Sequence, residues 1–253
     1  SRFGSGMPTD CARTALSEYL ESGHATLAGI EAEVRMFLAD PPPPSATKAM
    51  SRDTIQREAS VDFDAFARAR HSVRNFTGAP VAPEVIRSAV RTAQWTPSVC
   101  NRQAGRVHAV YGREAMARAL RYQNGNTGFG HLAGAVLIVT ADLRCFTGSG
   151  ERNQAFVDGG LFAMSLNYAL HAKGLGTCMW NWSVNSDVDR AMRTAMGIPD
   201  TEVVITMLGV GHMPEQFLVA KSARRSLTEV LREIGGGEAS APVDAAHRKD
   251  SAA

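Results

Sequence analysis

Two uninterrupted apolar segments set the strongest constraint on the fold of this chain. Residues 135–141 form a β-branched apolar run, and residues 203–208 form a second run of the same kind. Short runs without alternating polar residues are typical of strands that are covered on both faces. The sequence therefore predicts that both runs are central strands of a sheet with helices on its two sides.

The segment between these runs, residues 156–172, is expected to form a long buried helix. Its large apolar residues surround most of the helix circumference. A helix that lacks a polar face has to be covered on both sides, so we expect it to pack on its own sheet and on a partner subunit. This pattern predicts a homodimer.

Weaker signals complete an α+β pattern. Apolar spacing predicts a strand over 107–111. The stretch 123–130 is rich in glycine and asparagine and is interpreted as a flexible lid or connector. Together these segments predict a central mixed sheet of about four or five strands flanked by helices. The expected helices cover 61–69, 83–95, 113–122 and 184–196.

Composition divides the chain into three parts. Residues 9–39 carry apolar residues at helical spacing with a break near Ser22 and Gly23, which favours two helices. Prolines at 41–44 cannot continue a helix and indicate an extended linker. We expect an N-terminal helical appendage and linker over 1–44, which could contact a protein partner. A main domain over 45–234 and a disordered tail over 235–253 would follow.

Charge and cysteine usage exclude several classes of function. The 27 Lys and Arg residues nearly balance 25 Asp and Glu residues without a dense basic run, so nucleic acid is not expected as a partner. Neither the four scattered cysteines nor the histidines have metal-site spacing, and no disulfide framework is expected. Cys100 and Cys178 are interpreted as small hydrophobes rather than redox groups.

We expect a cytoplasmic protein without membrane contact. No apolar run reaches the roughly 18 to 20 residues of a membrane helix, and the first residues lack the apolar core of a signal peptide. The sequence begins at Ser1 rather than Met, which is consistent with a trimmed or processed chain.

Residues 70–76 carry polar groups suited to a phosphate ester. Arg70, Ser72 and Arg74 alternate, so in an extended segment their side chains would point the same way. Arginine offers a planar fork that pairs with two phosphate oxygens at once. Taken alone, the pattern is more typical of a solvated basic loop.

Three further segments contain residues that could take part in the same site, and each segment alone also has an ordinary interpretation. Residues 97–103 read as a turn, and residues 173–182 as a helix end followed by core aromatic residues. A basic group after the last apolar run reads as a charged surface turn. The side chains of interest are Pro97, Ser98, Asn101 and Gln103, then Trp180 and Asn181, then Lys221, Arg224 and Arg225.

In this order and at these intervals, the four segments resemble the FMN-dependent nitroreductase family over about residues 63–232. The resemblance implies an α+β nitroreductase-like fold and a homodimer with FMN at the interface. It implies that the loop 97–103 reaches the FMN from the opposite subunit, and that the Asn181 backbone N–H lies near flavin N5. The implied cofactor-binding residues are Arg70, His71, Ser72, Arg74, Pro97, Ser98, Asn101, Gln103, Trp180, Asn181, Lys221, Arg224 and Arg225, with no metal ligand and no certain catalytic side chain.

The resemblance further implies hydride transfer from NAD(P)H through the flavin to a nitroaromatic, quinone or similar small acceptor. Two alternatives stay open: a flavin oxidase or dehydrogenase acting on a biosynthetic intermediate of a polysaccharide or natural product, and an FMN-binding scaffold without turnover. The family usually continues Gln-Pro-Trp in the second segment, whereas Gln103 is followed here by Ala104 and Gly105. This departure predicts a reshaped substrate pocket.

Overall fold

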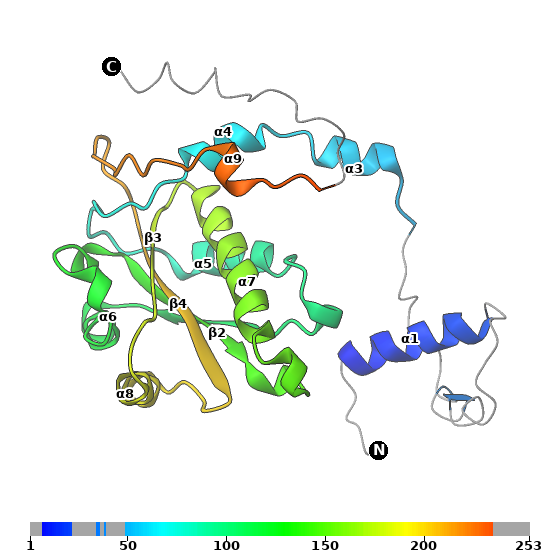
Figure 1. Ribbon diagram of the computed structural model, residues 1–253. Coiled ribbons are helices and arrows are strands. Elements are labelled where there is room, and N and C mark those ends of the chain that lie inside the picture. The colour runs from blue at the N-terminus through cyan, green and yellow to red at the C-terminus, as the bar shows by residue number, and fades with distance from the viewer. Residues whose placement is uncertain (1–6, 22–33, 36–37, 39–48, 235–253) are drawn as a thin grey trace.

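A four-stranded sheet lies between two layers of helices in the computed structural model (Figure 1). The structure describes residues 7–21, 34–35, 38 and 49–234. In the described part of the chain the spatial order of the strands is β1-β2-β4-β3. The strands are β1 (Gly105–Val110), β2 (Ala135–Asp142), β3 (Gly176–Trp180) and β4 (Glu202–Gly211).

The two predicted central strands are confirmed as the neighbours β2 and β4. They pair antiparallel, and every residue of β2 is buried. The edge strands β1 and β3 also pair antiparallel with their neighbours. Within the described ranges, parallel pairing, which the expected mixed sheet would contain, is confined to one isolated bridge between Ser72 and Thr177. Strand β3 was not predicted, because residues 176–180 were interpreted only as a helix end and core aromatic residues.

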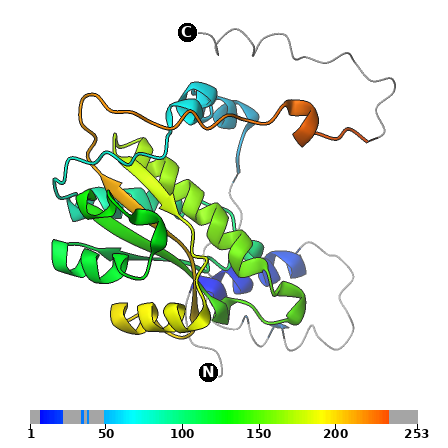
Figure 2. The same ribbon diagram turned by 60° about the vertical axis from the view of Figure 1, so that its left-hand side comes forward.

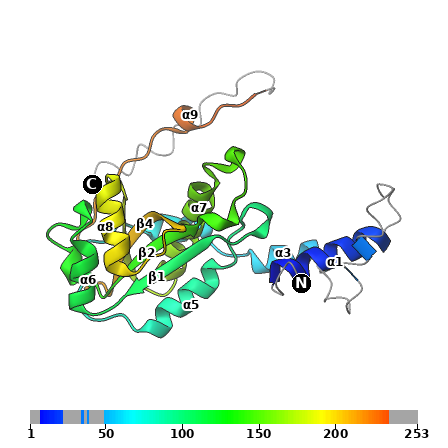
Figure 3. The same ribbon diagram turned by 90° about the horizontal axis from the view of Figure 1, so that it is seen from below.

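Each face of the sheet is covered by two helices, which Figures 2 and 3 show from the side and from below. Helices α5 (Pro83–Ala93) and α7 (Gln154–His171) bury one apolar cluster with the sheet. Helices α6 (Arg113–Leu120) and α8 (Ser186–Met196) bury the other. All four helices agree with the predicted segments to within a few residues. The outer side of α7 carries three apolar residues, Phe156, Val157 and Leu161, which are 48–53% exposed to solvent.

In the described residues, four further helices lie outside these layers: α1 (Met7–Glu21), α3 (Arg52–Glu58), α4 (Phe63–Ala69) and α9 (Leu227–Val230). Helix α1 ends next to the predicted break at Ser22. The second predicted N-terminal helix, the proline run and the predicted tail fall mostly or wholly outside the described residues. Helix α4 was predicted, whereas α3 and α9 were not. Among the described residues, no helix combines the length and apolar character that crossing a membrane requires.

The stretch 123–130 differs from the expected flexible loop. It contains the short 3-10 turn Asn124–Asn126, and a second turn, Gly130–Leu132, follows it. The Asn126 side-chain amide donates to the backbone carbonyl of Leu120 (3.0 Å), and the Gln123 side chain is buried. This hydrogen bond joins the stretch to α6, and within the stretch the Gly125 N–H donates to Gln123 Oε1 (2.6 Å). The stretch therefore forms a packed part of the α6 face.

Candidate functional site

Residues 70–76 run along the outer edge of β3. The Val73 N–H donates to the Thr177 carbonyl (2.8 Å), and the Thr77 N–H donates to the His212 carbonyl (3.0 Å). Val73 and Phe76 are buried in the core, whereas Ser72 and Arg74 are exposed. Alternate residues of an extended segment point to the same side, so this burial pattern places the two polar side chains together.

Two glycines allow this close approach to the sheet. A Cβ at Gly176 would lie 3.0 Å from Val73 Cγ1, and a Cβ at Gly211 would lie 2.8 Å from Phe76 Cδ1. Both distances are shorter than side chains tolerate without movement. The glycines at the end of the sheet therefore help to set where residues 70–76 lie.

The cations of this segment are available for a ligand. In the part of the chain that the structure describes, Arg70 and Arg74 form no ion pair or hydrogen bond with another side chain, and His71 is exposed. The Arg74 guanidinium carbon lies 5.9 Å from the centre of the Phe129 ring, a cation–π distance. This set of donors fits an anionic or carbonyl-rich ligand such as the phosphate and pyrimidine edge of a flavin nucleotide.

The end of β3 lies close to the same ring. The centres of the Phe129 and Trp180 rings lie 6.0 Å apart. Trp180 is buried, and its Nε1 has no hydrogen-bond partner among the described residues. The Trp180 carbonyl accepts from Thr206 Oγ1 (2.7 Å), and the Asn181 carbonyl accepts from Gln123 Nε2 (3.1 Å). Two side chains thus fix the peptides at 180 and 181. Gln123 was not predicted as part of a site, because a buried amide in a polar loop has no distinctive sequence pattern.

The loop 97–103 lies at the opposite corner of the sheet. It leads into β1, whose Gly105 pairs with Ala141, whereas Thr177 lies level with Ala135 at the other end of β2. Strand geometry separates these corners by roughly 20 Å along β2 and roughly 14 Å across the strands. Within one chain, the structure therefore does not bring Pro97, Ser98, Asn101 and Gln103 together with Arg70, Ser72 and Arg74.

This loop has an unusual backbone. Cys100, Asn101 and Gln103 have φ values of +47°, +52° and +51°, which non-glycine residues seldom adopt. Ser98 Oγ accepts from the Gln103 N–H (2.9 Å), and Asp158 Oδ2 accepts from the Val99 N–H (3.1 Å). Cys100 is exposed, so its interpretation as a small hydrophobe is wrong. Cys178 is buried, and burial raises the pKa of its thiol.

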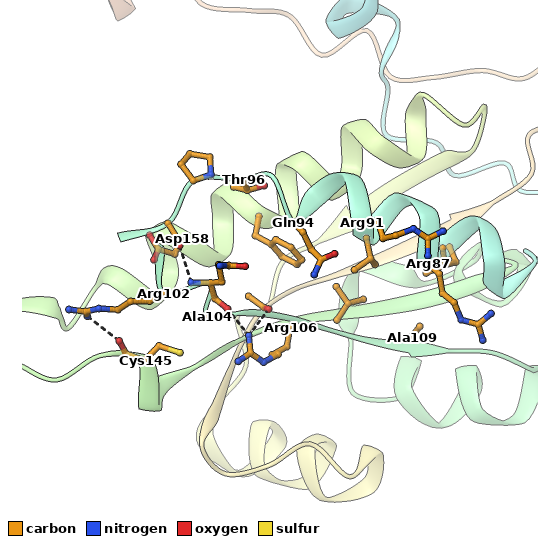
Figure 4. A pocket seen from close by; sticks show the side chains of 18 of the residues that line it. Arg87, Arg91, Gln94, Thr96, Arg102, Ala104, Arg106, Ala109, Cys145 and Asp158 are labelled. Carbon is orange, nitrogen blue, oxygen red and sulfur yellow. Dashed lines mark hydrogen bonds between the residues drawn. The ribbon is translucent and has the colours of Figure 1, made fainter. Parts of the chain in front are cut away.

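A pocket of about 810 Å³ opens between α5 and β1, on the inner side of this loop (Figure 4). Its lining includes Ser98 and Gln103 but no residue of the segment 70–76. Four arginines reach it, of which three form ion pairs: Arg87 with Glu84 (2.6 Å), Arg102 with Glu151 (2.6 Å) and Arg106 with Asp142 (3.5 Å).

The basic group after β4 is not brought to the other site residues. Lys221, Arg224 and Arg225 are exposed on a segment that leaves the helix and sheet layers (Figure 3). Arg225 pairs with Glu229 (3.2 Å) on the short helix α9. In the described residues, no hydrogen bond, ion pair or ring contact joins the three cations to residues 70–74.

One comparison with known proteins identifies a family. The model of the Nitroreductase family matches residues 67–126 and 113–212, which together span more than half of the 253 residues. A search of curated proteins found no match.

Solved structures share the fold at low sequence identity. A nitroreductase family protein from Streptococcus pneumoniae has a TM-score of 0.59 at 19% identity, covering 68% of this chain and 100% of that one. An FMN-dependent nitroreductase from Clostridium difficile has a TM-score of 0.52 at 18% identity, covering 62% and 91%. A protein from Desulfovibrio desulfuricans, solved in complex with FMN, has a TM-score of 0.57 at 20% identity, covering 70% and 98%.

Proposed function

Because the chain belongs to the nitroreductase family, we propose that it is an FMN-dependent oxidoreductase that works as a homodimer. NAD(P)H reduces the flavin, and the reduced flavin passes the hydride to a nitroaromatic, quinone or similar small acceptor. The flavin supplies the redox chemistry, and the chain binds, orients and shields it.

One observation carries this proposal: the two halves of the expected flavin site occupy opposite corners of the same sheet. Two such chains related by a two-fold axis can place the segment 70–76 of one beside the loop 97–103 of the other. Each dimer then has two equivalent sites. In this arrangement the residues expected to bind the flavin come together only between two chains.

The chain's residues have distinct roles in this proposal. Arg70, Ser72 and Arg74 bind the flavin nucleotide from the edge of β3. Gln123 and Thr206 hold the carbonyls of residues 181 and 180, which orients the Asn181 peptide toward the flavin ring.

Exposed apolar side chains support the dimer. Phe156, Val157 and Leu161 are about half exposed on the outer side of α7, and Trp95 at the end of α5 is 85% exposed. Apolar groups gathered on one face of a protein commonly mark a contact with another chain. Helices α5 and α7 pack against each other on the same side of the sheet, so a single partner surface would cover both.

The substrate side of the site is reshaped at residues 104 and 105. Ala104 is fully buried, and a Cβ at Gly105 would lie 2.8 Å from Phe162 Cγ. Phe162 also lines the pocket between α5 and β1. The Phe162 ring of α7 therefore lies beside residues 104 and 105, the two positions at which the family usually has a proline and a tryptophan.

An absorbance spectrum tests the proposal. The purified protein, supplied with FMN and freed of excess by gel filtration, is expected to retain a flavin spectrum that NADH or NADPH bleaches without oxygen. A protein that retains no FMN would contradict the proposed function. Retained FMN that neither nicotinamide bleaches would instead favour an oxidase or a scaffold.

A further inference from the structure

The loop between α5 and β1 contains three of the four non-glycine residues with positive φ in the described chain. These residues, Cys100, Asn101 and Gln103, lie within four consecutive positions, and Cys100 and Asn101 are exposed. Such a conformation persists only where the surroundings determine it, and it is found most often at functional sites. The question is which side chain imposes it.

Asp158 on α7 is placed to do so. Its residue is 4% exposed, and its two oxygens have different partners. Oδ2 accepts from the Val99 N–H (3.1 Å), directly before the first left-handed residue, and Oδ1 accepts from Gln154 Nε2 (2.8 Å). Among the described residues, no cation pairs with this carboxylate. A buried carboxylate without a counter-charge is unfavourable, so its hydrogen bonds to the loop and to Gln154 compensate for its burial.

Other contacts hold the far half of the loop. Ser98 Oγ accepts from the Gln103 N–H (2.9 Å), and Arg102 donates to the Cys145 carbonyl (3.0 Å) and to Glu151 (2.6 Å). The segment before α7 and the start of α7 therefore hold both ends of a turn in which Asn101 is exposed (Figure 4 shows Asp158 and Arg102).

We propose that Asp158 is a positioning residue that acts across the dimer: it locks the loop of its own subunit in the left-handed conformation that contacts the FMN bound mainly by the partner. This inference rests on the proposed function, in which the loop and the segment 70–76 of different chains share one flavin. In this proposal Asp158 acts through the loop and not by direct contact with the flavin.

Single variants measure the effect of the carboxylate. Asp158→Ala is expected to raise the FMN dissociation constant by about tenfold, since it removes a charge-assisted hydrogen bond to the loop. Asp158→Asn keeps an oxygen acceptor and is expected to stay close to the original protein. Gln154→Ala is the matched control, because it removes the other partner of the carboxylate and leaves the Val99 contact.

A rescue separates positioning from general destabilisation. Glycine adopts positive φ without strain, so adding Cys100→Gly to Asp158→Ala is expected to restore much of the FMN affinity. A protein weakened only in its overall fold would not regain affinity from a glycine in an exposed loop.

Mixed dimers, assembled from two differently tagged chains, then test the action across the interface. A dimer of one Arg74→Ala chain and one Asp158→Ala chain has both defects in the same site and keeps the other site unaltered. It is expected to bind one FMN per dimer with the original affinity. A dimer of the doubly substituted chain with an unaltered chain has one defect in each site and is expected to have no site of original affinity.

If Asp158→Ala does not fold, Asp158→Leu, which has similar bulk but no acceptor, replaces it.

Each outcome decides the proposal. The reverse pattern in the two mixed dimers, or identical binding by both, would overturn it. So would an Asp158→Ala protein with unchanged FMN affinity, or a loss that Cys100→Gly leaves unaltered. An unsubstituted protein that does not bind FMN would overturn the proposed function as well, and a titration of that protein distinguishes this failure from the others.

Discussion

At the residue scale, Arg74 should matter more than other exposed arginines. It lies above the Phe129 ring without an ion-pair partner among the described side chains. Arg74→Ala removes a charge-assisted contact worth about 1.5 to 3 kcal/mol, so the FMN dissociation constant should rise at least about tenfold. Fluorescence titration with FMN measures this change.

Arg190→Ala serves as the control for Arg74→Ala, because Arg190 lies on α8 in an exposed ion pair with Asp187 (3.6 Å). Such pairs contribute little to stability. Equal losses of FMN affinity in the two variants would contradict a specific role for Arg74.

Asp142 should make stability depend on acid pH. Its hydrogen bonds with the Arg144 guanidinium, and the nearby charge of Arg106, hold the pKa of this buried carboxyl below its ordinary value near 4. A lowered pKa in the folded state stabilises the protein above the unfolded-state pKa, and this stabilisation is lost as the pH falls through the lower, folded-state pKa.

Urea unfolding at a series of pH values below about 5 should therefore show that the free energy of unfolding decreases as the pH falls. Asp142→Asn should be less stable at neutral pH and show a weaker dependence over this range. An unchanged acid dependence in Asp142→Asn would assign the effect to other carboxyl groups.

Individual site residues could be predicted from the sequence only where their chemistry is visible in the chain order. The alternation of Arg70, Ser72 and Arg74 has a recognisable pattern. Gln123 and Asp158 act through backbone groups 58 and 59 residues away. Nothing in the local sequence indicates such a distant partner, so these two roles emerge only from the folded structure.

At the element scale, the exposed face of α7 should form the dimer contact. Leu161 is 48% exposed and lies between apolar neighbours, so Leu161→Arg would place a charge in the proposed interface. A buried unpaired charge is strongly unfavourable, and the variant should be monomeric at micromolar concentration and have weakened FMN binding. Light scattering during gel filtration measures the mass.

Ala117→Arg is the matched control for the α7 variant, because Ala117 is an exposed residue of α6 on the other side of the sheet. It should leave the dimer intact. A Leu161→Arg protein that remains a dimer with FMN would place the interface elsewhere.

Elements with strong local patterns were predicted correctly, whereas strand β3, which is defined by its pairing, was not. The continuous apolar runs of β2 and β4 indicate burial on both faces without any knowledge of their neighbours. Strand β3 has only five residues and begins with a glycine, and it exists because it pairs with β4. The loop 123–130 was expected to be flexible because its composition is polar, whereas its asparagine and glutamine side chains hydrogen-bond within it.

At the scale of the whole molecule, the sequence alone could not show that the expected flavin site is divided between distant corners of one sheet. That division follows from the strand order β1-β2-β4-β3, in which the chain segments of the two halves border opposite edges. The resemblance implies a site shared by two subunits, and the sheet geometry agrees with it, because one chain keeps the two groups of expected site residues at opposite corners.

The central claim is that FMN is held between two copies of this chain. Native mass spectrometry of the protein with added FMN tests it directly, because it reports the subunit count and the number of bound flavins in the same particle. We expect a dimer with two FMN molecules and a monomer fraction without flavin. A monomer that carries FMN, or a dimer that carries none, would contradict it.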